Sequence, residues 1–252
     1  MSKSATRGLT AAMGVSELAD ASQRSGHADS NGAVRLLTPL FKMHGTERAR
    51  VSATEAMEVR GGNGFIEDWP EPRLLRDVYV HAIWEGAGNV IALDVLRAIE
   101  HGALPGYLAD TERHAEAAAG SGPASPLSAP ILQALERVRH DLGALQAAGP
   151  EERQLPIRRL ARRMAMIAIA ARLAEQGNAF AADTGSGRLA WLAARYTARL
   201  VGDGAAAALA DDTAWLAHAG AVLHGGPVPV ELAADAARSL AGRATSATPV
   251  SL

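Results

Sequence analysis

The stretch "RLLRDVYVHAIWEGAGNVIALDVLRAIE", residues 73–100, carries two helical patterns separated by a short turn. Before the turn, apolar residues recur at the spacing of one helical face, namely Leu74, Leu75, Val78 and Ala82. After the turn, the same spacing returns with Val90, Leu93 and Ile99 and stops at Gly102. The pattern predicts two helices joined tightly, with Glu85 set in the turn between Trp84 and a run of small residues.

The rest of the chain favours helix almost everywhere. The sequence has 252 residues, of which 48% are hydrophobic and only 4% aromatic, and Ala, Leu and Arg dominate it. No alternating stretch of β-branched residues is long enough to require a sheet. The sequence therefore predicts an all-α fold: a helical bundle followed by an Ala/Arg-rich helical extension.

Changes in composition along the chain suggest five segments. A helix is expected to begin with Thr38 as its N-cap and Pro39 at its first position, and to end at Gly61 and Gly62. The Pro, Gly and Ser content of residues 103–127 is typical of a linker. The expected segments are 1–32 as a weakly ordered stretch or short helix, 33–102 as the first helical domain, 103–127 as the linker, 128–243 as the helical extension and 244–252 as a frayed tail.

Charge and cysteine content exclude several classes of site. The net charge is −2, so no general basic field recruits nucleic acid or an anionic membrane. The chain contains no cysteine, which excludes disulfides and thiolate metal sites and makes the cytoplasm the expected compartment. No apolar run approaches the roughly 18 to 20 residues of a membrane span. No histidine pair or carboxylate cluster has metal-ligand spacing, so no metal site is expected.

Three motifs follow one another in residues 55–100. A helix is closed by Gly-Gly-Asn-Gly, an Arg-Leu-Leu-Arg-Asp run follows a proline, and an aromatic-Glu-Gly turn is followed by Asn89. In this order they resemble the end of the catalytic domain in the flavin-dependent acyl-CoA dehydrogenases, closest to their alkylation-response, DNA-binding branch. The resemblance covers residues 33–101, fades over 1–32, and rests over 103–252 only on an arginine-rich helical extension.

The resemblance implies that Glu85 is a general base. Members of this family remove a proton next to the thioester carbonyl of an acyl-CoA while hydride passes to FAD, which leaves an α,β double bond. The residues themselves allow this role, because a carboxylate beside Trp84 and packed against an acyl chain would be poorly solvated and a better proton acceptor. The alternative is the ordinary solvated end of a helix.

The resemblance also assigns cofactor contacts. It implies that Glu58, Gly61 and Gly62 approach the adenosine end of an FAD held largely by a neighbouring subunit. It places Gly86, Ala87 and Asn89 beside the flavin of their own site. For the glycines alone, a helix C-cap and tight turn is an equally good interpretation.

Two positions depart from the family pattern at these contacts. Ala87 lacks the hydroxyl that Ser or Thr offers to the flavin. Glu58 would repel a pyrophosphate unless a group such as Arg60 neutralises it.

Other domains of the family would have to lie upstream of residue 33, where the given sequence has no room for them. We therefore expect a C-terminal piece, truncated at the N-terminus, that depends on a homo-oligomer or on a separate chain supplying the β-domain that holds FAD. A non-catalytic oligomerisation fragment is an alternative function.

A further alternative is a DNA-binding helical module. Spacings of four place Arg158 with Arg162, and Arg159 with Arg163, on shared faces of one helix, and the alkylation-response branch is similar in contacting duplex DNA through such a region. However, residues 102–252 contain 14 Arg and 14 Asp plus Glu. This balance also fits an ordinary solvated helix face.

Overall fold

The computed structural model describes residues 28–201 and 213–246, and all regular structure within these ranges is helical. The predicted all-α fold is therefore confirmed for the described part of the chain. The predictions for residues 1–27 and 247–252 lie outside it. Among the described helices, none is long and apolar enough to cross a membrane.

The described residues form two compact units. The hairpin unit contains residues 28–107 and 145–165, and the bundle unit contains residues 108–144, 166–201 and 213–246. The units do not follow the predicted domain boundaries, because residues 145–165 pack with the N-terminal part of the chain.

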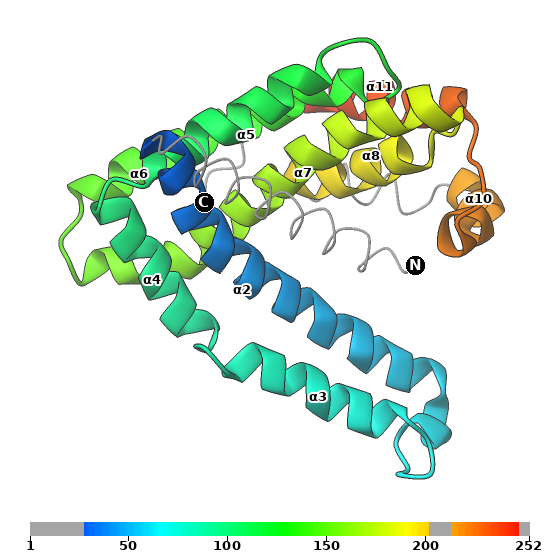
Figure 1. The fold of residues 1–252 in the computed structure, drawn as a ribbon, viewed down its shortest axis with the longest axis horizontal. Coiled ribbons are helices and arrows are strands. Elements are labelled where there is room, and N and C mark those ends of the chain that lie inside the picture. The colour runs from blue at the N-terminus through cyan, green and yellow to red at the C-terminus, as the bar shows by residue number, and fades with distance from the viewer. Residues whose placement is uncertain (1–27, 202–212, 247–252) are drawn as a thin grey trace. The chain divides into compact units, whose positions relative to one another are not determined.

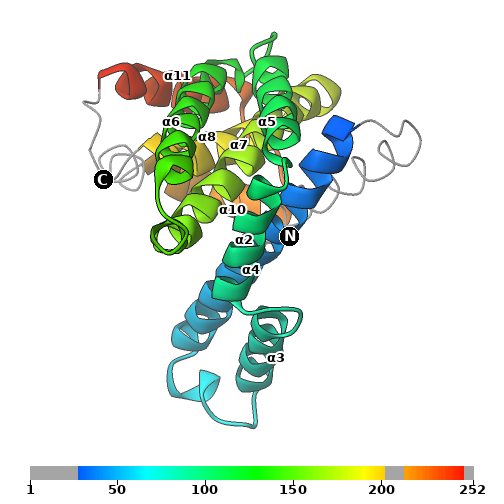
Figure 2. The ribbon, with the colours of Figure 1, turned by 90° about the vertical axis from the view of Figure 1, so that its left-hand side faces the viewer.

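The hairpin unit is built on two antiparallel helices (Figure 1). Helices α2 and α3 lie side by side and are joined through the 3-10 turn η1, and α4 packs back along α2. Seen from the side, α4 turns away from α3 and runs next to α2 (Figure 2). The elements are α2 (Ala28–Val59), η1 (Gly61–Gly64), α3 (Glu71–Ile83), α4 (Gly88–Glu100), the start of α5 (Leu104–Ala118), η3 (Glu152–Gln154) and the start of α7 (Ile157–Thr184).

Helix α2 begins eleven residues earlier than predicted, at Ala28, and Pro39 lies inside it. Thr38 is not an N-cap: its hydroxyl donates to the carbonyl of Val34 one turn earlier, at 2.8 Å. An interior proline removes one helical hydrogen bond and normally breaks a helix. Burial outweighs that loss here, because the side chains around it are fully buried, namely Leu36, Leu37, Leu40 and Met43.

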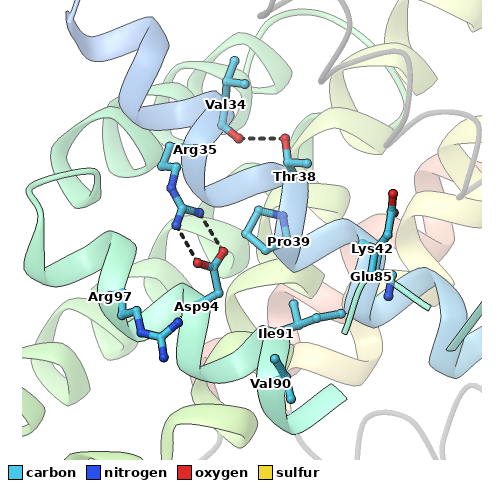
Figure 3. A pocket seen from close by; sticks show the side chains of 10 residues that line it. All are labelled: Val34, Arg35, Thr38, Pro39, Lys42, Glu85, Val90, Ile91, Asp94 and Arg97. Carbon is cyan, nitrogen blue, oxygen red and sulfur yellow. Dashed lines mark hydrogen bonds and ion pairs between the residues drawn. The ribbon is translucent and has the colours of Figure 1, made fainter. Parts of the chain in front are cut away.

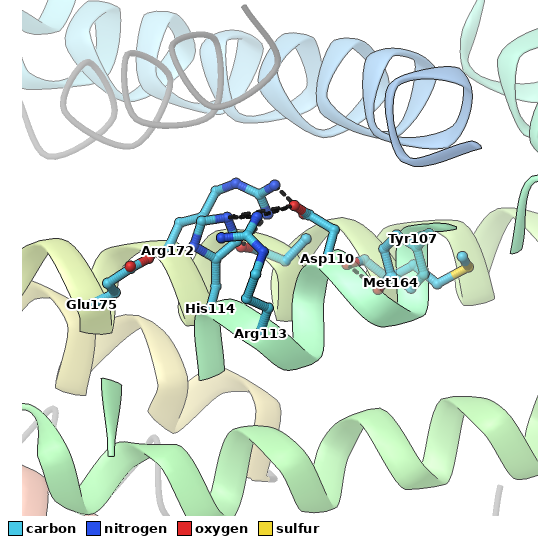
Figure 4. Close-up of polar contacts among 8 residues, drawn as sticks. Tyr107, Asp110, Arg113, His114, Met164, Arg172 and Glu175 are labelled. Atoms are coloured by element: carbon cyan, nitrogen blue, oxygen red, sulfur yellow. Dashed lines mark hydrogen bonds and ion pairs between the residues drawn. The ribbon is translucent and has the colours of Figure 1, made fainter. Parts of the chain in front are cut away.

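The predicted linker is wrong over most of its length, because Leu104–Ala118 forms helix α5. In the hairpin unit, Tyr107 is fully buried and its hydroxyl donates to the carbonyl of Met164 at 2.9 Å (Figure 4). The irregular part follows α5 and includes the short 3-10 turn η2 (Ser125–Leu127). Burial of apolar side chains on α5 therefore prevails over the Pro and Gly content that suggested a linker.

The bundle unit holds the rest of the helices and a buried polar network. It comprises the remainder of α5 and α7, η2, α6 (Ser128–Ala147), α8 (Arg188–Val201), α10 (Thr213–His224) and α11 (Val230–Ser246). Helix α11 packs on α8 and η2. The side chain of Arg172 on α7 is 1% exposed and pairs with Asp110 on α5, while His114 pairs with Glu175 (Figure 4).

Candidate active site

The turn between α3 and α4 carries Glu85 in a strained backbone conformation. Helix α3 closes with Trp84 donating its N–H to the carbonyl of Val80 at 3.0 Å. Glu85 then has φ of 56° and Gly86 has φ of 108°, before Ala87 returns to an extended conformation. Left-handed backbone is unfavourable for a residue with a Cβ, so Glu85 has to be held there by its surroundings.

Lys42 supplies that restraint from helix α2. Its ammonium donates to the carbonyl of Trp84 at 2.7 Å and to the carbonyl of Gly86 at 2.8 Å. These two acceptors flank Glu85, so one charged side chain fixes the backbone on both sides of it. Charged donors make the stronger class of hydrogen bonds.

Glu85 faces a cavity of about 540 Å³ between α2 and α4. Lys42 and Glu85 lie at one end, Pro39, Val90 and Ile91 line the middle, and Arg35, Asp94 and Arg97 lie at the other end (Figure 3). Val34 and Thr38 complete the lining.

A bidentate ion pair lines the far end of the cavity. The guanidinium of Arg35 donates to both carboxylate oxygens of Asp94, at 2.8 and 2.6 Å. These hydrogen bonds lower the pKa of Asp94 more than its burial raises it. The carboxylate of Asp94 therefore stays ionised, and the cavity has an apolar middle between two polar ends.

The chain alone does not shield the carboxylate of Glu85. Glu85 is exposed, and Trp84 beside it is 53% exposed. Poor solvation of Glu85, expected from the sequence, would therefore require an acyl group or another segment to cover it. The cavity has the apolar lining that such a group needs.

Asn89 is held by an arginine from far along the chain. Its Oδ1 accepts a hydrogen bond from Arg158 at 3.0 Å, and Arg158 also donates to Glu47 at 3.0 Å. Arg162 donates twice to the same carboxylate, at 2.9 and 2.8 Å. Burial raises the pKa of Glu47, but the hydrogen bonds and charges of the two arginines lower it further, to about 2.

The structure does not support the DNA-binding prediction. Arg158 and Arg162 do share one helix face, as the spacing predicted, but that face meets Glu47 and Asn89. Arg159 is exposed and Arg163 is half-buried on the same helix. At least two of the four arginines of the predicted basic cluster, Arg158 and Arg162, are therefore engaged within the hairpin unit.

The predicted contacts to the adenosine end of FAD lie elsewhere. Glu58, Gly61 and Gly62 are exposed and lie towards the start of α3, whereas the Glu85 turn follows its end. Helix α3 has 13 residues, so its two ends are about 20 Å apart. Within one chain, the residues predicted to contact the adenosine end of FAD are therefore far from those predicted to contact the flavin. This separation is compatible with the prediction that the two groups contact FAD molecules in different sites of an oligomer. A Cβ at the neighbouring Gly64 would collide with the Met57 carbonyl, so this glycine at least is required by the turn.

Sequence reasoning missed Lys42 and Glu47. Lys42 contacts the turn at a sequence separation of 42 residues, and Glu47 contacts Arg158 at a separation of 111 residues. No local spacing in the sequence indicates such contacts. The described residues contain no group of three or more His, Cys, Asp or Glu side chains that could hold a metal ion.

Comparisons with known proteins point to one family. Residues 6–100 match the profile of the acyl-CoA dehydrogenase C-terminal domain. The chain is 47% identical over 64 residues to acyl-CoA dehydrogenase family member 11 of Caenorhabditis elegans, which covers 25% of this chain and 10% of that protein. It is 46% identical over 74 residues to the putative acyl-CoA dehydrogenase AidB of Escherichia coli K12, which covers 29% of this chain and 14% of that protein.

A solved structure extends the similarity beyond the matched domain. The structure titled Bd2924 apo-form superposes with a TM-score of 0.51 at 26% identity and covers 68% of this chain and 30% of that chain. The chain thus spans only a small part of the relatives that it matches. Residues 6–100 thus match the C-terminal domain of the acyl-CoA dehydrogenases, and the matched relatives are acyl-CoA dehydrogenases.

Proposed function

We propose that this chain takes part in the FAD-dependent α,β-dehydrogenation of an acyl-CoA thioester, with Glu85 as the general base. The observation that carries the proposal is the position of Glu85, at the end of an apolar-lined cavity and on a turn that Lys42 clamps. A base has to lie next to a space for the reacting carbon, and the clamped turn holds the backbone of Glu85 beside such a space.

The chemistry assigned to the chain is a single proton transfer. The carboxylate of Glu85 takes a proton from the carbon next to the thioester carbonyl. Val90 and Ile91 line the cavity beside it, so an acyl chain lying there would displace water from the carboxylate. Loss of water makes a carboxylate a stronger base. Without substrate, Glu85 is exposed to water, so the acyl chain itself would have to supply this desolvation.

Bound FAD would supply the acceptor for the hydride that leaves the adjacent carbon. Gly86 and Ala87 are small enough to let the edge of a flat ring approach the backbone, and the start of α4 leaves backbone N–H groups without helical partners. These groups fit contact with part of a flavin and are too few to hold it whole. Ala87 has no hydroxyl to add.

The other predicted corner fits less well. Arg60 donates to Glu71 at 2.9 Å and stacks over Trp69 at 4.6 Å, so it is engaged away from Glu58. A pyrophosphate near Glu58 would therefore need a cation from another polypeptide. We propose that a further copy of the chain, or a separate chain with a β-domain, supplies the remaining FAD contacts.

The test is a flavin spectrum and a mass measurement on the protein purified from its native host. Bound FAD at a mass above 26.1 kDa would support the proposal. Addition of acyl-CoA thioesters should bleach the flavin, and Glu85→Gln should abolish the bleaching. Glu55→Gln, an exposed carboxylate on α2, serves as the control and should bleach normally. Bleaching that persists in Glu85→Gln would refute Glu85 as the base.

A second candidate function is assembly without catalysis, and the surface of α3 favours it. Leu74, Val80 and Ile83 are 54%, 57% and 64% exposed. Leu74 belongs to the predicted apolar face of α3, so part of that face is exposed in this chain. We propose that a second copy of the chain covers this surface, and a flavin-free protein of twice the chain mass would support this function alone.

A further inference from the structure

We infer that Arg158 is a positioning residue that sets the orientation of Asn89 and holds the start of helix α4. The functional meaning of this inference rests on the proposed function, because Asn89 is a proposed flavin contact. Arg158 belongs to residues 145–165, which lie beyond the family-matched segment and pack in the hairpin unit. A segment outside the recognised domain would thus help to build its site.

The contacts of Arg158 define which side of the Asn89 carboxamide is available. A guanidinium can only donate hydrogen bonds, so the Asn89 atom at 3.0 Å from Arg158 has to be the oxygen. The Nδ2 amino group of Asn89 is then the side left for a ligand. Arg158 therefore presents Asn89 as a donor.

Arg158 itself is fixed by a partly buried carboxylate. Its second nitrogen donates to Glu47, whose side chain is only 14% exposed. Arg162 binds the same carboxylate, so Glu47 holds two cations and its geometry is fixed from both sides. A planar guanidinium with separate donors can contact Glu47 and Asn89 at once, which a single ammonium nitrogen does less well.

The same segment also contacts the other end of α4. Arg153 reaches Glu100, the last residue of the helix, at 3.4 Å, while Arg158 contacts its second residue. The guanidinium of Arg158 also lies close to Gly88, the first residue of α4, because a Cβ there would be 3.5 Å from it, an ordinary contact distance. Residues 145–165 therefore hold α4 at both ends, and the N-terminal contact is the one next to Glu85.

The experiment uses the full chain and needs no flavin. In Arg158→Gln, hydrogen exchange of the backbone amides in residues 84–92 should become roughly tenfold faster or more, because a charged hydrogen bond is lost. The Nδ2 amide signals of Asn89 in a nitrogen–proton NMR spectrum should shift. Arg158→Lys keeps a positive charge near Glu47 and should preserve the fold. The Asn89 signals should still shift, because a lysine has no second nitrogen to donate to Asn89.

Arg159→Gln is the matched control, since Arg159 is the exposed neighbour on the same helix. It should leave both the exchange of residues 84–92 and the Asn89 signals unchanged. Wild-type Asn89 signals in folded Arg158→Lys and Arg158→Gln would overturn the inference. A chain that binds no flavin would refute the proposed function, and the exchange and NMR results would still decide the role of Arg158.

Discussion

At the scale of single residues, Glu85 combines a proposed catalytic role with an unfavourable backbone conformation. A left-handed conformation costs a residue other than Gly or Asn of order 1–3 kcal/mol. Asn tolerates this conformation better than Glu. We therefore expect Glu85→Asn to raise the free energy of unfolding by about 1 kcal/mol and to abolish flavin bleaching by acyl-CoA.

Glu85→Gln separates the backbone effect from the loss of charge. Gln keeps the shape and the strain of Glu, so its free energy of unfolding in denaturant titrations should match that of the wild type. Equal stability of the Asn and Gln variants would mean that the turn holds no strain at this residue. The φ of 56° at Glu85 would then not reflect a backbone cost that is accepted for function.

Glu47 makes the stability of the chain depend on pH in the acid range. Its pKa is about 2 in the folded protein against an ordinary value of 4.5. Unfolded chains therefore take up the proton first as the pH falls below 4.5, and the stabilisation that is complete above that pH is lost progressively towards pH 2.

Glu47→Gln should remove this acid slope and lower stability at pH 7 by about 1–2 kcal/mol, a modest value because its arginine partners keep much solvent contact. The two arginine side chains are 43% and 45% exposed. Urea titrations at several pH values would measure the slope, with Glu55→Gln as the control. A wild-type slope in Glu47→Gln would assign the acid sensitivity to other carboxylates.

At the scale of helices, local spacing was a good guide to some elements and a poor one to others. Helices α3 and α4 lie where their apolar repeats predicted them, because both repeats are short and end at turn residues. Pro39 and the linker-like composition after Gly102 misled the prediction for α2 and α5. In both, long-range burial overrides a local signal, and a single sequence does not reveal what a helix will pack against.

Helices α5 and α7 are joined in the bundle unit by a buried ion pair. Arg172 and Asp110 are 1% and 5% exposed, and Asp110 also accepts a hydrogen bond from Arg113 at 2.6 Å. Removing one partner leaves a buried charge without its main counterion. We expect Arg172→Met to lower the free energy of unfolding by about 3–5 kcal/mol.

An exposed pair provides the comparison for Arg172. Arg238 and Asp235 on α11 are 61% and 70% exposed, so Arg238→Met should cost less than about 1 kcal/mol. Thermal or denaturant unfolding of both variants would measure the difference. Similar losses in the two variants would mean that Arg172 contributes through something other than its buried pairing with Asp110.

At the scale of the whole molecule, the candidate site joins segments that are distant in sequence. Glu85, Gly86 and Asn89 could be singled out from one short motif, because the turn and its residues are adjacent. The sequence did not reveal the contact of Lys42 with that turn or the contact of Arg158 with Glu47, which is 111 residues away. Only folding brings these segments together. Neither interpretation of the arginine cluster included the contact with Glu47, because this acidic partner lies in another helix.

The exposed apolar surface of α3 leads to a prediction about assembly. If a second copy covers Leu74, Val80 and Ile83, the protein should have a mass that is a multiple of 26.1 kDa in light scattering. Replacing these three residues by Glu should give the mass of a single chain, since charged side chains are costly to bury in such an interface.

Substitution of an exposed charged residue on the same helix controls for effects on folding. Arg73→Glu alters α3 at a side chain that is 82% exposed, and it should leave the mass unchanged. Circular dichroism should report equal helix content in both variants. A single-chain mass for the wild type would refute self-association through α3, and the contacts for FAD would then have to come from a different polypeptide.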